Sequence, residues 1–128
     1  MKLEELQVYR LSMELGEKIW EIVIDWDYFL KDTMGKQLVR SADSVAANLS
    51  EGFGRFFYKE NKQLCYYSRG SLFETKTWLT KAKHRKLISE NQFEIFTKDI
   101  ELIGKKLNSY IKSIGNQSSI DLLQSNDK

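Results

Sequence analysis

The sequence predicts an all-α fold, and three observations carry that prediction. Proline is absent from all 128 residues. No run of β-branched residues alternates strictly between apolar and polar positions, as a half-buried strand would. Four segments instead space their apolar residues at the three- and four-residue steps of an amphipathic helix. Four such segments joined by short connections favour an antiparallel, up-down-up-down four-helix bundle.

The first helix is expected over residues 4–26, with apolar residues on two sides. One stripe contains Val8, Leu15 and Ile19, and a second contains Met13 and Trp20. A helix on the surface of a monomeric bundle needs only one apolar stripe of about 100°. The two stripes therefore predict that this helix packs on both sides, either centrally in its own domain or against another subunit, and we expect a homo-oligomer.

The second and third helices are expected from residue 32 or 33 to residue 52–55, and from about residue 58 to residue 87. Asp32 or Thr33 would cap the second helix, and Gly52 and Gly54 would end it in the left-handed conformation that glycine adopts without strain. Gly70 lies in the middle of the third helix, where glycine costs about 1 kcal/mol relative to alanine. We expect a neighbouring helix to approach closely at Gly70.

The fourth helix is expected from a capping box at Ser89 and Gln92 to Gly115. The bundle domain would then comprise residues 1–115. Residues 116–128 form a polar tail, which we expect to be partly disordered, although three apolar residues in it offer a short docking turn: Ile120, Leu122 and Leu123.

The candidate chemical groups do not form a catalytic or metal-binding pattern. His84 is the single histidine and lies in a basic run, which fits a solvated helix C-terminus. Cys65 is the single cysteine, so it cannot form an internal disulfide or a Cys-x-x-Cys zinc pair, and we interpret it as a packing thiol. We expect no enzyme activity, no metal and no cofactor. We also expect a cytoplasmic protein, because no signal sequence or membrane-spanning stretch is present.

The charge is unevenly distributed, although the net charge is only +2. Residues 1–32 hold eight acids and four bases, whereas residues 33–128 hold ten acids and sixteen bases. Residues 76–86 contain five cations and no acid. A solvated face and a phosphate-binding face both explain this pattern, and repetition around an oligomer favours binding. The candidate contacts are Lys81, Lys83, Arg85, Lys86, Lys105 and Lys106.

Polar residues and glycines gather between residues 37 and 74, around the junction of the second and third helices. Glu51 and Glu74 are expected to form buried ion pairs with Arg40, Arg55 or Arg69 rather than to act as a catalytic pair. We expect two motifs, Asn48/Glu51/Arg55 and Gly70/Ser71/Glu74, to meet at one polar junction.

This stretch resembles the four-helix bundle family of proteins encoded within intervening sequences of bacterial 23S ribosomal RNA genes. The resemblance covers residues 3–115 and includes an opening Leu6-x-Val8-Tyr9. The resemblance implies a ring-shaped homopentamer. The family offers no enzymatic precedent for this chain. The resemblance also implies a relation to accessory proteins of diversity-generating retroelements, which bind a reverse transcriptase and nucleic acid. The matching motif residues are Gln37, Arg40, Asn48, Glu51, Gly52, Gly54, Arg55, Glu60, Arg69, Gly70, Ser71 and Glu74.

Two functional hypotheses follow. The first is a non-enzymatic scaffold or accessory protein that contacts RNA or DNA through the basic surface of the third and fourth helices. The alternative is a module that binds a partner protein, such as a reverse transcriptase, without affinity for nucleic acid. Phe56 and Phe57, next to the helix junction, would then anchor the partner.

Overall fold

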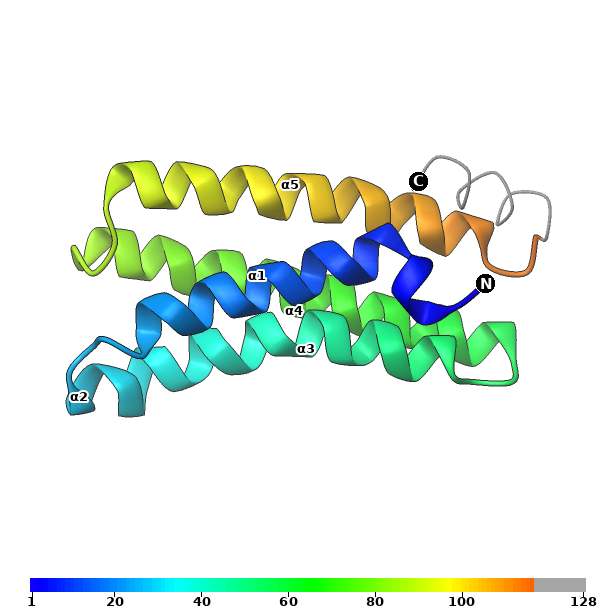
Figure 1. Cartoon of the computed structure of the whole chain (residues 1–128), viewed down its shortest axis with the longest axis horizontal. Helices are drawn as coiled ribbons and strands as arrows, with labels where there is room; N and C mark the ends of the chain where they lie inside the picture. Colours follow the sequence, from blue (N-terminus) through cyan, green and yellow to red (C-terminus); the bar gives the residue numbers. More distant parts are fainter. Residues whose placement is uncertain (117–128) are drawn as a thin grey trace.

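The computed structural model describes residues 1–116 and shows an all-α fold with four long helices and no strand in that range. The long helices are α1 (Gln7–Val23), α3 (Lys36–Phe53), α4 (Tyr58–His84) and α5 (Glu90–Ser113), and they lie side by side (Figure 1). The expectations for residues 117–128, including a docking turn, lie outside the described residues. The expected division into a bundle domain over residues 1–115 and a tail over residues 116–128 therefore stays a prediction.

α1 begins later than expected, because residues 3–5 form a separate 3-10 turn, η1 (Leu3–Glu5). Its buried face is continuous and includes Val8, Leu15, Ile19 and Val23. The second apolar stripe behaves differently: Met13, Trp20 and Ile24 are each about half exposed, at 46%, 51% and 49%. The single chain thus covers the first stripe of α1 but only part of the second, of which Leu6 and Val23 are buried while Met13, Trp20 and Ile24 stay half exposed.

The helix expected to start at Asp32 or Thr33 starts earlier, at Tyr28. The Asp27 side chain caps it by accepting a hydrogen bond from the backbone N–H of Leu30 at 3.0 Å. A first turn, α2 (Tyr28–Leu30), passes through a π-helical turn, η2 (Lys31–Gly35), directly into α3. Tyr28 and Phe29, which follow Asp27 in this first turn, are largely exposed.

The end of α3 lies where the sequence predicted it, but no glycine ends the helix in the expected left-handed conformation. α3 ends at Phe53, and Gly54 caps it in an ordinary right-handed conformation with φ −81°. The cap of α5 is as expected: the N–H of Gln92 donates to Ser89 Oγ at 3.0 Å, and the N–H of Ser89 donates to Gln92 Oε1 at 2.8 Å. α4 ends at His84, three residues earlier than expected, and Lys86 follows with a left-handed φ of +62°.

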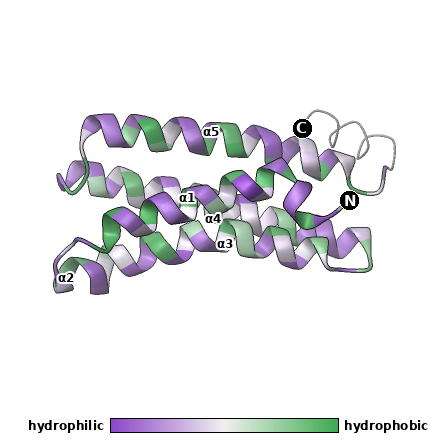
Figure 2. Cartoon of the chain, viewed as in Figure 1, coloured by the Kyte–Doolittle hydropathy of each residue, from purple (hydrophilic) through white to green (hydrophobic). Residues whose placement is uncertain are grey.

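Each long helix packs on two others: α1 on α3 and α5, and α4 on α3 and α5. The contact between α3 and α4 is the most extensive of these. Figure 2 shows hydrophobic and hydrophilic residues mixed along every long helix, as expected for amphipathic helices. Leu15, Leu38, Leu49, Leu79, Ile103 and Leu107 are among the fully buried side chains of the shared core. None of the helices described between residues 1 and 116 is long and apolar enough to cross a membrane.

Candidate functional site: the α3–α4 interface and the charged surfaces

The α3–α4 interface is built from small residues and a few buried hydroxyl groups. Ser68 Oγ on α4 donates a hydrogen bond to the backbone carbonyl oxygen of Val45 on α3 at 2.7 Å. Further along, Thr75 Oγ1 lies 3.0 Å from Ser41 Oγ. Ser41, Val45, Ser68 and Thr75 are all fully buried. Side chains this small let the two backbones approach closely, so their hydroxyl groups can bond across the gap.

Gly52 lies where the two backbones come closest at the connection. A Cβ atom on Gly52 would lie 2.6 Å from Asn61 Oδ1 and 3.1 Å from the Asn61 carbonyl oxygen. Asn61 is itself held in place, because its Nδ2 donates to Tyr110 Oη on α5 at 3.4 Å. Gly52 therefore serves helix packing rather than helix termination.

The polar motif residues form two clusters rather than the single junction expected from the sequence. In the first, Arg40 donates both to Gln37 Oε1, at 2.9 and 3.1 Å, and to Glu74, while Trp78 Nε1 donates to Glu74 Oε2 at 3.0 Å. The hydrogen bond from Trp78 and the Arg40 guanidinium hold the pKa of Glu74 below its ordinary value, against an opposing effect of burial. This cluster ties the first half of α3 to the middle of α4.

The second cluster lies at the connection between α3 and α4. Arg55 Nη2 lies 2.8 Å from Glu51 Oε1, and Arg55 Nη1 lies 3.9 Å from Glu60 Oε2. Asn48 joins neither cluster, because its Nδ2 donates to the Ser44 carbonyl oxygen within α3 at 2.9 Å. The pairing of Arg40 with Glu74 and of Arg55 with Glu51 is confirmed, but both pairs lie at the surface rather than in the interior.

The expectation of a close helix contact at Gly70 is wrong. A Cβ atom on Gly70 would meet nothing within 4 Å, and the residue is exposed. The helix contacts in this part of α4 come from neighbouring positions instead. Ser68 and Thr75 make contacts with α3, whereas the Ser71 carbonyl oxygen accepts a hydrogen bond from Thr75 Oγ1 at 2.8 Å within α4.

The Arg40–Glu74–Trp78 cluster makes a pH-dependent contribution to stability. Since the pKa of Glu74 is lower in the folded than in the unfolded chain, the stabilisation is present above the ordinary pKa of 4.5 and is lost as the pH falls through the folded value. For a surface pair we expect Glu74→Gln to cost about 0.5 kcal/mol at neutral pH. Urea unfolding between about pH 7 and about pH 3 should show this difference disappear in acid. The control is Glu94→Gln, at an exposed position; an equal effect there would contradict the assignment.

The candidate phosphate contacts divide into groups with different surroundings. Lys81, Arg85 and Lys86 are exposed and make no ion pair within residues 1–116. Lys83 turns toward α5, where its Nζ lies 3.4 Å from Glu90 Oε2 and 4.6 Å from the centre of the Phe93 ring. Three of the four expected cations at this end of α4 are therefore free to contact a ligand.

Lys105 and Lys106 do not join this cluster. Glu90 lies beside Lys83, and Lys105 follows fifteen residues later on α5, about 22 Å along the helix at 1.5 Å per residue. Lys106 also shares a helical row with Asp99 and Leu102, which line the contact with α1. The two lysines thus belong to other faces of the bundle.

The remaining chemical groups form no recognisable catalytic arrangement. Burial raises the pKa of the Cys65 thiol to about 12, so it stays protonated and is a poor nucleophile. His84 is exposed at the end of α4. Within residues 1–116, no group of three His, Cys, Asp or Glu side chains is placed to hold a metal ion.

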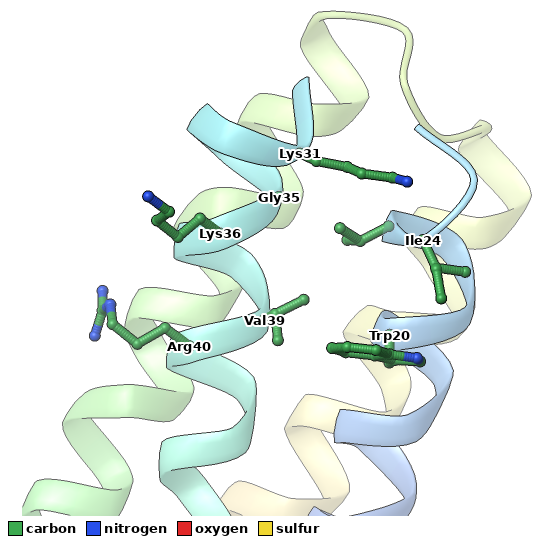
Figure 3. A pocket seen from close by; sticks show the side chains of 8 residues that line it. Trp20, Ile24, Lys31, Gly35, Lys36, Val39 and Arg40 are labelled. Atoms are coloured by element: carbon green, nitrogen blue, oxygen red, sulfur yellow. The ribbon is translucent and has the colours of Figure 1, made fainter. Parts of the chain in front are cut away.

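Sequence patterns did not reveal the surface hollows. One of about 420 Å³ lies between α1 and α3 and is lined by Ile24 among others, and Figure 3 shows Trp20 pointing toward Val39 while Lys31 extends across the gap. Another of about 460 Å³ lies between α4 and α5 and is lined by Phe73 and Gly104, among others. For the first hollow, the only signal in the sequence was the second apolar stripe of α1. For the second hollow, the only signal was the nearby Gly70.

The fold and the α3–α4 motif agree with a comparison against protein families. The model of the 23S rRNA-intervening sequence protein family matches residues 4–109. The chain belongs to this family. No curated protein sequence matches the chain.

A solved structure from the S23 ribosomal protein family of Bacteroides thetaiotaomicron VPI-5482, described as a protein with unknown function, is similar to this family member. The two are 26% identical with a TM-score of 0.74, and the match covers 82% of this chain and 98% of the other. The similarity therefore spans the four-helix fold and leaves the biochemical role open to proposal.

Proposed function

We propose that this protein is a non-enzymatic accessory protein that associates with copies of itself and contacts the phosphates of RNA or DNA. The observation that carries the proposal is the set of exposed, unpaired cations at the end of α4, namely Lys81, Arg85 and Lys86 within the part of the chain that the structure describes. Lys and Arg that neutralise phosphates release counterions and so provide sequence-independent affinity. A chain with a net charge of +2 needs such a local concentration of charge to bind a polyanion.

Self-association is the second part of the proposal. The short connections, and the packing of each long helix on the next, favour an up-down-up-down bundle. The half-exposed residues of α1, such as Met13 and Trp20, favour association with another copy, and a ring-shaped homopentamer is the assembly that the family resemblance implies. A ring would present the basic end of α4 once per subunit and multiply the phosphate contacts. Buried Cys65 suits a reducing cytoplasm, where we place the protein.

The test is binding of a fluorescently labelled structured RNA and a duplex DNA, measured by anisotropy at several salt concentrations. We expect salt-sensitive binding by the native protein. The variant Lys81→Glu/Arg85→Glu/Lys86→Glu should bind about tenfold more weakly, and the slope of log K against log salt should fall by about 0.9 for each lost contact on duplex DNA. Lys83 is left unchanged because it packs on Phe93.

The matched control carries the same change in net charge at exposed positions elsewhere: Lys2→Glu/Lys59→Glu/Lys112→Glu. Equal weakening by both variants would mean that the end of α4 is not the binding surface. Absence of binding even at low salt would reject nucleic-acid contact altogether.

That second outcome would favour a module that binds a partner protein. Phe56 and Phe57 support this candidate, because they are 89% and 61% exposed in the connection between α3 and α4. Their rings pack edge to face with centres 5.0 Å apart, which fixes an aromatic anchor on the surface. A reverse transcriptase is a partner that the family resemblance implies.

A further inference from the structure

The hollow of about 460 Å³ between α4 and α5 has an exposed aromatic ring at its side. Phe73 is 65% exposed and lines the hollow together with the buried Leu72 and Ile100. Gly104 keeps the α5 side open, because a Cβ atom there would meet only Leu72 Cδ2, at 3.8 Å. The hollow is therefore an open, partly apolar recess next to an aromatic ring that the chain leaves uncovered.

Two cations flank Phe73 on α4. Arg69 lies four residues before it and Lys76 three residues after it, so both share its side of the helix, and both line the hollow. The Arg69 side chain is held in place, because its Nη1 donates to Asn108 Oδ1 on α5 at 3.1 Å and its Cζ lies 4.9 Å from the centre of the Tyr66 ring. Neither cation forms an ion pair within residues 1–116, so both are available to an anionic ligand.

The α5 side of the hollow carries a carboxylate and an amide, on Glu101 and Asn108. A carboxylate repels a phosphate but accepts hydrogen bonds from N–H groups such as those on the edge of a nucleobase. A hydrocarbon chain would instead cover both polar groups without giving them a partner, which is unfavourable. The hollow thus offers an aromatic ring to a base, hydrogen-bonding groups to the edge of that base, and cations to the neighbouring phosphates.

Phe73 also begins an exposed helical row that leads to the cations of the proposed function. Thr77, Lys81 and Arg85 follow it at steps of four residues, and all are exposed. The row extends about 18 Å from Phe73 to Arg85, at 1.5 Å per residue. A strand whose phosphates contact Lys81 and Arg85 can therefore run along α4 and reach the hollow.

We propose that the hollow between α4 and α5 binds an unpaired base of single-stranded nucleic acid. The base stacks on Phe73, and the phosphates on either side of it contact Arg69 and Lys76. A base in a duplex is already stacked and paired, so its face is not available to Phe73. The inference rests on the nucleic-acid contact in the proposed function and names the single strand as the preferred ligand.

The test is the anisotropy of a labelled, unstructured oligonucleotide, prepared as RNA and as DNA, alone and annealed to its complement, at about 0.15 M salt. The native protein should bind the single strands more tightly than the duplexes. Phe73→Ala should weaken single-strand binding about tenfold, as expected for the loss of one stacked base, and leave duplex binding unchanged. The matched control is Phe29→Ala, at a ring that is 72% exposed on α2, which should change neither.

Two further variants separate stacking from general apolar contact. Phe73→Trp should bind single strands like the native protein, whereas Phe73→Leu should bind them as weakly as Phe73→Ala, because only an aromatic ring stacks on a base. Gly104→Leu fills the recess from the α5 side and should also weaken single-strand binding alone. Circular dichroism of each variant checks that the fold is kept.

The outcomes separate this inference from the proposed function. Equal weakening of single-strand and duplex binding by Phe73→Ala, or native affinity in Phe73→Leu, would overturn the stacked base. Displacement of the strand by an equal concentration of a free mononucleotide would overturn the assignment to a strand. Unchanged binding in every Phe73 variant, with a loss in the Lys81/Arg85/Lys86 variant, would overturn the inference and leave the proposed function in place. Absence of binding to any of the oligonucleotides at low salt would overturn both.

Discussion

Gly52→Ala is expected to lower the free energy of unfolding by about 2 kcal/mol, although alanine is the better helix former. The new methyl group would lie 2.6 Å from Asn61 Oδ1, 3.1 Å from the Asn61 carbonyl oxygen and 3.2 Å from Leu64 Cβ. Two of these atoms belong to the backbone or stem of α4, so α3 and α4 must separate. Asn61 cannot swing aside freely, because it bonds Tyr110. Urea unfolding followed by circular dichroism measures the loss.

Gly70→Ala is the matched control, because it makes the same change in the middle of a helix where nothing lies within 4 Å. It should raise the free energy of unfolding by about 1 kcal/mol. Both variants should be compared with the native protein at equal protein concentrations, because association of copies would add a concentration-dependent contribution. Destabilisation by Gly70→Ala, or stabilisation by Gly52→Ala, would contradict the assigned roles of the two glycines.

The helices were predictable from the sequence because local signals specify them. The capping box at Ser89 and Gln92 and the alternating apolar steps of α5 correspond directly to the observed cap and buried face. The start of the second helix was not found, although Asp27 is a good capping residue. Asp32 and Thr33 are capping residues of the same kind a few positions later, and only the three-dimensional arrangement shows that the helix already begins after Asp27.

The polar motif was predictable in its pairs but not in its geometry. Opposite charges in this stretch indicated that Glu51 and Glu74 pair with arginines, and the structure selects Arg55 for Glu51 and Arg40 for Glu74 while Arg69 pairs with neither. Their separation into two clusters depends on the register between α3 and α4. Gly52 lies beside Asn61 and Val45 beside Ser68, so Arg40 and Glu74 lie several turns from the connection. Sequence spacing along one helix carries no information on this register.

The sequence also could not show which surface residues are available for contact, for a different reason. Five cations in residues 76–86 mark a basic segment, but only the packing of Lys83 on Phe93 shows which cation is unavailable. Gly70 was expected to contact a neighbouring helix, because such a contact would offset the cost of a glycine inside a helix. In the folded chain a Cβ atom on Gly70 would meet nothing within 4 Å, and sequence spacing alone could not show this.

Ser68→Leu is expected to lower the free energy of unfolding by about 3 kcal/mol, the largest effect among these variants. Ser68 is fully buried where α4 contacts α3, and its hydroxyl group reaches the Val45 carbonyl oxygen at 2.7 Å. Leucine adds three carbon atoms to a contact made by small residues on both helices. The interior is packed too densely to absorb them without moving a backbone. Urea unfolding at pH 7 measures the change.

Ser68→Ala separates packing from hydrogen bonding at the same position. It removes the hydroxyl group without adding volume, and the Val45 carbonyl oxygen remains available to the backbone N–H four residues later in α3. We therefore expect a loss of only about 1 kcal/mol. Equal losses for Ser68→Ala and Ser68→Leu would mean that the hydrogen bond, rather than the close approach of the backbones, stabilises the α3–α4 interface. A larger loss for leucine would show that the small residues in the motif set the distance between the two helices.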